Sequence, residues 1–412
     1  MVPVELPLVE TLSLNFAQKA PVLGAFCTDM KKLFSFIVCL CLSLVVMADE
    51  TPLSVAERNA QQGFNDTIDR LAPDFVTVSL CVTDPGHVLY SILGHAALRM
   101  ECPAFGLDYV FSYESESVQG KVFRFLLNDL KMGMMSVPTE EYLQLYREEG
   151  RGVRSYRLNL PPKAKSELWR ILDEKVEEGI YLPYDYIKRG CATSCRRLVE
   201  SVADIHYAKS TLQDKRTMRE QFYDHAPKGW ALFECMTLVG GQVDDAHLPA
   251  LTRLIAPVEL VDAWQKATVN GQPLMTEPEE LIPTERVYNG DRFLPIYVAL
   301  LLLALAIGSL FWEKPYIDWI LLALQTLLGL LMLWLLICPL PGSEWSWLIV
   351  VFNPLPLIFW HWRKYWALPY AIIILLWCIG MLLAPHRLVD YAHLIWAVSF
   401  AVVLLKQWRM AR

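Results

Sequence analysis

The 412-residue sequence lacks any run rich in lysine and arginine, and its formal net charge is −7. A nucleic-acid-binding surface needs clustered positive charge to neutralise phosphates, so this composition argues against nucleic acid as a partner. Histidine is also scarce, with 8 residues, and His361, His386 and His393 lack the cysteine or carboxylate partners that would complete a metal site. The sequence therefore predicts neither a metal nor another cofactor.

Charged residues are rare after Phe293, where Leu, Ile, Val, Ala and Trp dominate. Residues 49–271, in contrast, have the mixture of polar and apolar residues that is typical of a soluble domain. The segment between them, residues 272–292, is rich in proline and glutamate. Because the chain is long enough for two domains, we predict a soluble domain over 49–271, a linker over 272–292 and a membrane domain over 293–412.

The N-terminal segment has the pattern of an export signal. Met30-Lys31-Lys32 supplies a basic start, an apolar run follows over residues 33–47, and Ala48 ends it with a small residue. This run is shorter than the about 20 residues that a membrane-spanning helix needs, so we predict a signal peptide over 30–48 rather than an anchor. Residues 1–29 complete a leader over 1–48 without an assignable role, and we expect the true start at Met30.

Apolar stretches in residues 293–412 predict an all-α transmembrane domain of about five helices. They cover about 293–312, 317–338, 345–360, 367–384 and 391–405. The third is short and is interrupted by Asn353-Pro354-Leu355-Pro356, which predicts a kinked or partly re-entrant segment. One helix would suffice as an anchor, so we expect the five to take part in substrate access, with simple anchoring as the alternative.

Basic residues predict the orientation of these helices. If the soluble domain lies outside, the outer loops contain mainly Arg387. The inner loops then contain Lys314, Arg363, Lys364, Lys406, Arg409 and Arg412. This asymmetry satisfies the positive-inside rule and agrees with the export signal.

Periodicity predicts a mixed α+β fold for the soluble domain, with a small antiparallel sheet and helices packed on it. Alternating patterns predict strands near residues 76–82, 109–113 and 153–160. Helical patterns predict helices over 54–71, 138–149 and 161–178.

Export would place the soluble domain in an oxidising compartment, where disulfides form. The domain contains an odd number of cysteines. They are Cys81, Cys102, Cys191, Cys195 and Cys235. At least one thiol should stay free or pair outside the domain, and Cys191 is the candidate. Cys81 and Cys102 could form a disulfide, but connectivity does not follow from sequence. Cys195 follows Cys191 by one helical turn, and without a second such pair the spacing is weak support for a metal or redox site.

Cys191 opens a helical pattern over residues 192–202. A cysteine at a helix N-terminus lies at the positive end of the helix dipole, beside free backbone N–H groups, and both lower the pKa of its thiol. His95 follows Gly94 in an apolar segment, residues 88–100, about a hundred residues earlier. Brought together by the fold, the two would form a nucleophile–base pair, although each alone is more often a structural residue.

Four motifs resemble those of one known family, and they cover residues 91–99, 110–113, 157–160 and 184–193. Together they resemble the Lnb N-terminal periplasmic domain family, over about residues 50–275. That family is similar to the circularly permuted NlpC/P60 papain-like proteins, including the lecithin:retinol acyltransferase group, in which the histidine also precedes the cysteine. The resemblance implies this permuted papain-like fold, with Cys191 and His95 as the catalytic residues.

The sequence departs from the family's pattern in three places. The family usually has Asn before the cysteine, Tyr before Gly-His and Asn-Tyr-Gly on the next strand. This chain has Gly190, Leu93 and Ser112-Tyr113-Glu114 at these positions. The differences leave the Cys–His pair intact and change the accessory polar groups.

Family members with transmembrane helices after this domain act as lipoprotein N-acyltransferases. The resemblance implies that Cys191 takes a fatty acyl group from a membrane phospholipid as a thioester. The acyl group would then pass to the α-amino group of the diacylglyceryl-cysteine of an apolipoprotein, with His95 moving protons in both steps. Tyr113 is a candidate to orient the imidazole, and Arg99 to meet a phosphate or stabilise the fold. Ser91 and Thr193 are further accessory candidates.

The same resemblance implies a location. We expect a multi-pass protein of the inner (cytoplasmic) membrane, with the N-terminal domain in the periplasm and the C-terminus in the cytoplasm. Its partners would be a phospholipid acyl donor, a diacylated apolipoprotein acceptor and the membrane itself.

Two other functions stay open. An NlpC/P60-type cysteine amidase or peptidase, or a lipid hydrolase of the cell envelope, would use water as the final acceptor. Wall enzymes usually carry wall-binding modules or a single anchor, and the sequence has neither. A non-catalytic membrane scaffold would instead keep Cys191 and His95 as packing residues of its core.

Overall fold

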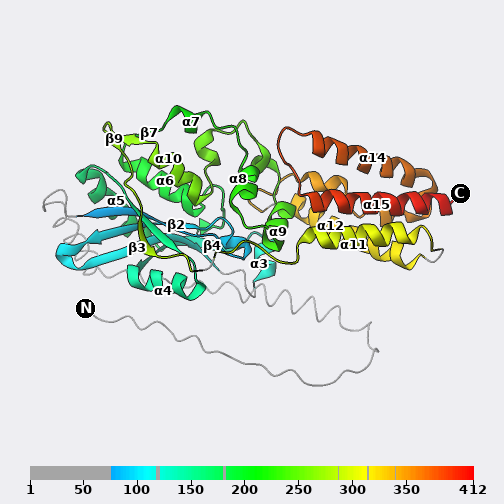
Figure 1. Cartoon of the computed structure of the whole chain (residues 1–412), viewed down its shortest axis with the longest axis horizontal. Coiled ribbons are helices and arrows are strands. Elements are labelled where there is room, and N and C mark those ends of the chain that lie inside the picture. The colour runs from blue at the N-terminus through cyan, green and yellow to red at the C-terminus, as the bar shows by residue number, and fades with distance from the viewer. Residues whose placement is uncertain (1–75, 117–120, 180–181, 286, 313–314, 339) are drawn as a thin grey trace, which may run out of the picture. The chain divides into compact units, whose positions relative to one another are not determined.

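The computed structural model describes residues 76–116, 121–179, 182–285, 287–312, 315–338 and 340–412. The expected leader over 1–48, with its signal peptide over 30–48, and the expected helix over 54–71 lie outside these residues. The described chain forms a mixed α/β domain, followed by a group of apolar helices (Figure 1).

The α/β domain is built on a seven-stranded antiparallel sheet with the order β10-β5-β1-β2-β3-β4-β6. Its strands are β1 (Thr77–Thr83), β2 (His95–Cys102), β3 (Leu107–Ser115), β4 (Lys131–Pro138), β5 (Val153–Arg157), β6 (Leu182–Pro183) and β10 (Glu279–Ile282). A second sheet joins β7 (Ile205–His206), β8 (Thr268–Val269) and β9 (Gln272–Pro273). The predicted antiparallel sheet is confirmed, and it is larger than expected.

The helices of this domain are α3 (Val122–Leu126), α4 (Thr139–Glu149), α5 (Pro162–Glu177), α6 (Cys191–Val202), α7 (Lys209–Leu212), α8 (Met218–His225), α9 (Trp230–Leu238) and α10 (Pro257–Gln265). Helices cover both faces of the sheet. Successive side chains of its central strands point to opposite faces, and those on each face are buried in a separate core. Leu80 and Leu98 belong to a large core that includes residues of α5, α6 and α10. Cys81 and Ala97 belong to a smaller core that includes residues of α4 (Figure 1).

Part of the expected linker belongs to the sheet. Residues 279–282 form β10, which pairs with β5. Of its four residues, two are exposed glutamates and only Ile282 is buried, so the stretch has the composition of a linker. Pairing with β5 satisfies the hydrogen bonds of backbone groups that an open sheet edge would expose. The partner strand is more than a hundred residues away in the sequence, so local composition did not predict this pairing.

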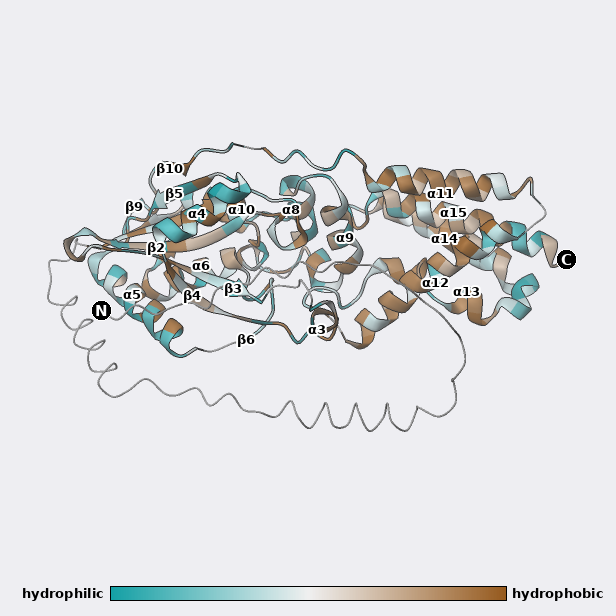
Figure 2. Cartoon of the chain, turned by 90° about the horizontal axis from the view of Figure 1, so that it is seen from below, coloured by the Kyte–Doolittle hydropathy of each residue, from teal (hydrophilic) through white to brown (hydrophobic). Residues whose placement is uncertain are grey.

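The apolar helices are α11 (Pro295–Ser309), α12 (Tyr316–Ile337), α13 (Leu355–Ile358), α14 (Arg363–Leu383) and α15 (Tyr391–Met410). Figure 2 shows that most of their residues are hydrophobic. Three described helical stretches are long and apolar enough to cross a membrane, namely Tyr316–Ile337, Trp360–Leu383 and Tyr391–Met410. The other two predicted spans correspond to shorter helices, Pro295–Ser309 and Trp347–Ile358. In the latter, Pro354 and Pro356 prevent a continuous helix, so the expectation of about five spans is supported for three.

The α/β domain contacts the apolar helices through α8 and α9. Glu220 lies 3.1 Å from His386 Nδ1, in the turn before α15. Thr237 Oγ1 lies 2.9 Å from His393 Nε2 in α15. The Gly240 N–H donates to the carbonyl of Gly342, in the loop after α12, at 2.6 Å. The last of these contacts brings the loop over 340–345, hereafter the 340s loop, against the α/β domain.

Candidate active site

Gly94 and His95 mark the point where the chain enters β2. Gly94 has φ +84°, and a Cβ there would overlap the carbonyl oxygen of Thr83 at the end of β1. Only glycine meets both conditions without strain. The backbone thus requires glycine at position 94, and His95 follows it as the first residue of β2, where Thr83 pairs with it across the sheet.

Cys191 is the first residue of α6. The loop before it is held by side chains of the first helical turn, since Thr193 Oγ1 donates to the Ile187 carbonyl at 3.1 Å and Ser194 Oγ donates to the Arg189 carbonyl at 3.0 Å. A Cβ on Gly190 would overlap the Tyr186 carbonyl oxygen. The close approach of these two backbone segments explains why glycine precedes the cysteine in this chain.

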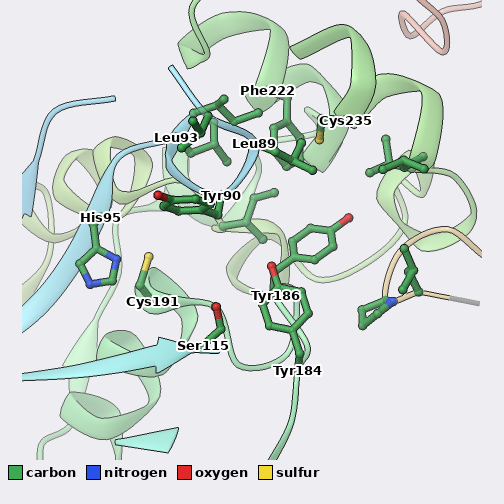
Figure 3. Close-up of a pocket in the computed structure, with 18 of the residues that line it drawn as sticks. Leu89, Tyr90, Leu93, His95, Ser115, Tyr184, Tyr186, Cys191, Phe222 and Cys235 are labelled. Carbon is green, nitrogen blue, oxygen red and sulfur yellow. The ribbon is translucent and has the colours of Figure 1, made fainter. Parts of the chain in front are cut away.

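Cys191 and His95 face each other, with the sulfur beside the imidazole ring (Figure 3). Burial raises the pKa of the Cys191 thiol, but the charge of His95, a hydrogen bond with it and the backbone N–H groups of Ala96 and Ala192 lower this pKa more, so it lies below its ordinary value. Burial also opposes protonation of His95, yet the negative charges of Glu114 and Cys191 hold the pKa of His95 well above its ordinary value. The two opposite shifts favour a thiolate–imidazolium pair.

Ser112 and Glu114 hold the imidazole from β3. His95 Nε2 lies 2.6 Å from Ser112 Oγ, which donates to Glu114 Oε1 at 2.7 Å. Glu114 Oε1 is itself 3.3 Å from His95 Nε2. Burial raises the pKa of Glu114, but the charge of His95 and hydrogen bonds from His95 and Ser112 bring it below its ordinary value. Because Ser112 and Glu114 engage Nε2, Nδ1 is the ring nitrogen that remains for the hydrogen bond with the Cys191 thiol.

Sequence reasoning named Tyr113 for this orienting role and missed its two neighbours. Side chains alternate along a strand, so Ser112 and Glu114 share one face of β3, while Tyr113 packs against the large core on the other. Tyr113 lines the cavity described below, and burial followed by the charge of Cys195 raises its pKa. The alternation, combined with a carboxylate at position 114, is the signal that could have identified Glu114.

The other accessory candidates lie outside the cavity lining. Arg99 donates to both carboxylate oxygens of Asp108, at 2.8 and 2.7 Å, and lies 2.9 Å from Glu101. Ser91 Oγ donates to the Val88 carbonyl at 3.2 Å. Thr193 holds the loop before α6, as described above. The structure therefore brings Cys191, His95 and Tyr113 to one cavity and gives Arg99, Ser91 and Thr193 local contacts.

A cavity of about 450 Å³ opens from the Cys–His pair. Its lining is predominantly apolar and comes from distant parts of the chain, including Phe125, Leu238 and Leu340. Leu93 and Phe222, labelled in Figure 3, also line it. Leu340 belongs to the 340s loop, so the apolar helices contribute directly to the wall. The chemistry of the lining suits a hydrocarbon chain better than a polar group.

The cysteines of the described residues are all free thiols. Cys81 and Cys102 belong to cores on opposite faces of the sheet, which explains why they do not pair. Burial raises the pKa of Cys195 well above its ordinary value and that of Cys235 to about 12. Cys191 alone among the described residues combines a lowered thiol pKa with a neighbouring imidazole. No group of three or more His, Cys, Asp or Glu side chains in this part of the chain is arranged to hold a metal ion.

The fold and the apolar helices define a membrane protein whose α/β domain carries a Cys–His pair. Residues 64–221 match the family model of the Lnb N-terminal periplasmic domain. The resemblance to the Lnb family is thereby confirmed for this segment, and the protein is a membrane protein with a periplasmic N-terminal domain. No curated protein and no solved structure matches the chain.

Proposed function

We propose that the protein is a cysteine-dependent lipoprotein N-acyltransferase. It takes a fatty acyl group from a membrane phospholipid and transfers it, through a thioester on Cys191, to the α-amino group of the diacylglyceryl-cysteine of an apolipoprotein. The observation that carries the proposal is the Cys191–His95 pair at one end of a largely apolar cavity whose wall includes the 340s loop.

In the first half-reaction, the Cys191 thiolate attacks the ester carbonyl of the phospholipid. Backbone N–H groups at the start of α6 have no partner within the helix and would stabilise the oxyanion. The intermediate collapses when the C–O bond of the ester breaks. His95 gives its proton to the departing lysophospholipid oxygen, which leaves a thioester and a neutral imidazole.

In the second half-reaction, the α-amine attacks the thioester. Such an amine has a pKa of about 7.7–8.0, so a useful fraction is neutral near pH 7. Neutral His95 accepts the proton released from the amine, the C–S bond breaks, and the thiolate–imidazolium pair is restored. Glu234, which lines the cavity, would attract the cationic form of the acceptor. Glu114 would favour the imidazolium in both halves.

The proposed location is the inner membrane, with the α/β domain in the periplasm and the C-terminus in the cytoplasm. In support, Lys406 and Arg409 lie at the end of α15 away from the turn that contacts the α/β domain. Basic residues favour the cytoplasmic side. Both substrates are lipids, and holding the reactive thiol at the membrane raises their effective concentration.

The test is an acyl-transfer assay with the full-length protein in phospholipid vesicles and a diacylated lipopeptide, with products analysed by mass spectrometry. The wild type should give an N-acylated lipopeptide and, in the absence of acceptor, an acyl thioester on Cys191. Cys191→Ala and His95→Ala should each reduce the rate on the order of 10⁴-fold or more, the scale of removing the nucleophile or the base from a catalytic triad.

Matched controls are Cys338→Ala and His206→Ala, which remove a cysteine and a histidine outside the cavity lining. Both should retain wild-type rates. Free fatty acid in place of N-acylated lipopeptide would instead identify a hydrolase. Wild-type rates of acyl transfer in both active-site variants would rule out the catalytic assignment.

A further inference from the structure

The short helix α3, between β3 and β4, exposes large apolar side chains. Phe123 is 83% exposed and Leu127, the residue after the helix, is 54% exposed. Exposed apolar surface of this kind is unfavourable in water and typical of a site that contacts a partner or a membrane. Phe125, on the same helix, lines the cavity that contains Cys191.

A spanning helix fixes the position of α3. The indole Nε1 of Trp334 donates to the carbonyl of Leu126 at 2.8 Å. Trp334 lies three residues before the end of α12 at Ile337, and the 340s loop follows. That loop contacts the α/β domain through Gly342, so this end of α12 is the one beside the α/β domain. Tryptophan near the end of a spanning helix is typical of the membrane–water interface, which places α3 at the same level.

The charges next to Phe123 are compensated locally. Lys121 Nζ and Arg124 both donate to Glu116, each at 2.9 Å, and Arg124 also contacts Asp129 at 3.1 Å. Hydrogen bonds from Arg124 and Lys121, in that order, lower the pKa of Glu116 to about 2, so the carboxylate stays ionised at neutral pH. Pairing of this kind reduces the cost of bringing these charges to the edge of the hydrocarbon region.

We propose that α3 inserts Phe123 and Leu127 into the membrane leaflet that faces the α/β domain and forms the port through which an acyl chain passes from the bilayer to the cavity at Cys191. The insertion follows from the exposed side chains and the Trp334 contact. The role as a port rests on the proposed function, and Phe125 supports it because it joins the helix to the cavity wall.

Insertion can be tested by replacing Phe123 with a benzophenone-bearing residue in the full-length protein, reconstituted in phospholipid nanodiscs. Leu145 and Leu212, exposed to 52% and 51% on α4 and α7, are the matched control positions. After irradiation, the position 123 probe should give about tenfold more phospholipid adduct than either control, as expected for an apolar ring that prefers lipid to water. Equal adduct yields at the three positions would overturn the insertion.

The port is tested without acyl transfer, by following alkylation of Cys191 with mass spectrometry of the peptide that contains it. Two reagents are compared, a maleimide tethered to a phospholipid and a small water-soluble maleimide. The double variant Phe123→Asp/Leu127→Asp should slow the lipid-tethered reagent about tenfold, because the charges oppose insertion, and leave the soluble reagent unchanged. Leu145→Asp/Leu212→Asp should affect neither.

Slowing of both reagents, or of neither, would overturn the port. The double variant should have the same unfolding temperature as the wild type, because both substituted positions are exposed. This result verifies that the fold is retained. If the lipid adducts and the selective slowing are observed while the wild type gives no N-acylated lipopeptide, the proposed function fails and the lipid port stands.

Discussion

At the scale of single residues, the reactivity of the site depends on how His95 is held. The imidazole is flanked by the Cys191 sulfur and by the Ser112–Glu114 pair, and the carboxylate favours its charged form. A cysteine and a histidine alone would compete for one proton with little preference for the ion pair. Glu114 shifts this competition, because a nearby negative charge raises the pKa of the imidazole and so lowers that of the thiol.

We expect Glu114→Gln to shift the pH dependence of Cys191 alkylation. The thiolate fraction rises as the pH increases through the pKa of the thiol, and a lowered pKa places this rise below that of an ordinary cysteine. Without the carboxylate, His95 is less often protonated, so the thiol pKa increases and the acid limb moves up by about one unit. The measurement is the rate of alkylation of Cys191 by iodoacetamide between pH 5 and 9.

Glu101→Gln is the control, since Glu101 contacts Arg99 on β2 and not His95. Its profile should coincide with that of the wild type. A Glu114→Gln profile that also coincides with the wild type would show that the carboxylate has no influence on the pair.

At the scale of elements, the start of α6 is determined by the loop over residues 184–190. Hydrogen bonds from Thr193 and Ser194 hold this loop against the first turn of the helix. Gly190 lies so close to the Tyr186 carbonyl that a side chain has no room. The position of the thiol therefore depends on a glycine that never touches the imidazole.

Gly190→Ala should displace this loop. Relieving the overlap with Tyr186 requires a backbone shift, and overpacking of this kind typically costs about 1–3 kcal/mol of stability. We expect a lower free energy of unfolding and slower alkylation of Cys191 at neutral pH, because the sulfur moves away from His95. Thermal unfolding and the iodoacetamide rate measure the two effects.

Gly380→Ala in α14 is the matched control, because no atom lies within 4 Å of the Cβ that it adds. Alanine is the better helix former, so its stability should be unchanged or slightly higher. If Gly190→Ala matched this control in both measurements, close packing at residue 190 would not be what positions the thiol.

At the scale of the whole molecule, buried polar contacts hold the apolar helices at both ends, to the α/β domain at one end and to each other at the other. Beside the α/β domain, Thr237 contacts His393. Near the other end, Lys406 Nζ lies 2.9 Å from Asp318, and Gln407 donates to the same carboxylate at 2.6 Å. Asp318 and Lys406 are 1% and 7% exposed. This pair connects the start of α12 to the end of α15.

Asp318→Ala should destabilise the helices strongly, because it leaves the Lys406 charge buried without a partner. Breaking such a pair typically costs about 3–5 kcal/mol. Replacing both residues, as in Asp318→Ala/Lys406→Met, should recover much of the loss. Thermal unfolding of the full-length protein in detergent provides the comparison.

The exposed pair of Lys266 and Asp262 on α10 is the reference, with 49% and 55% of the side chains exposed. Asp262→Ala should cost no more than about 0.5 kcal/mol, as is usual for such helix pairs. An effect of this small size for Asp318→Ala would mean that the buried pair does not hold α12 to α15.

The sequence by itself determined those features that depend on neighbouring residues. Period and composition predicted the antiparallel sheet, the apolar C-terminal part and the helix that begins at Cys191. The Gly94-His95 pair and the helix start at Cys191 identified the two residues that face each other. The same local patterns predicted the interruption of the third apolar segment at Pro354 and Pro356. Hydropathy alone did not show that the first segment forms a helix of only 15 residues, Pro295–Ser309.

Only the tertiary structure decided which groups surround the Cys–His pair. Glu114 reaches His95 through the pairing of β2 with β3, and the 340s loop reaches the cavity from more than two hundred residues after His95. The helix α3 contacts α12 through the indole of Trp334. β10 likewise joined the sheet from within the expected linker. Contacts between distant segments depend on strand register and helix packing, and these are fixed when the whole chain buries its apolar surface rather than by any one stretch of residues.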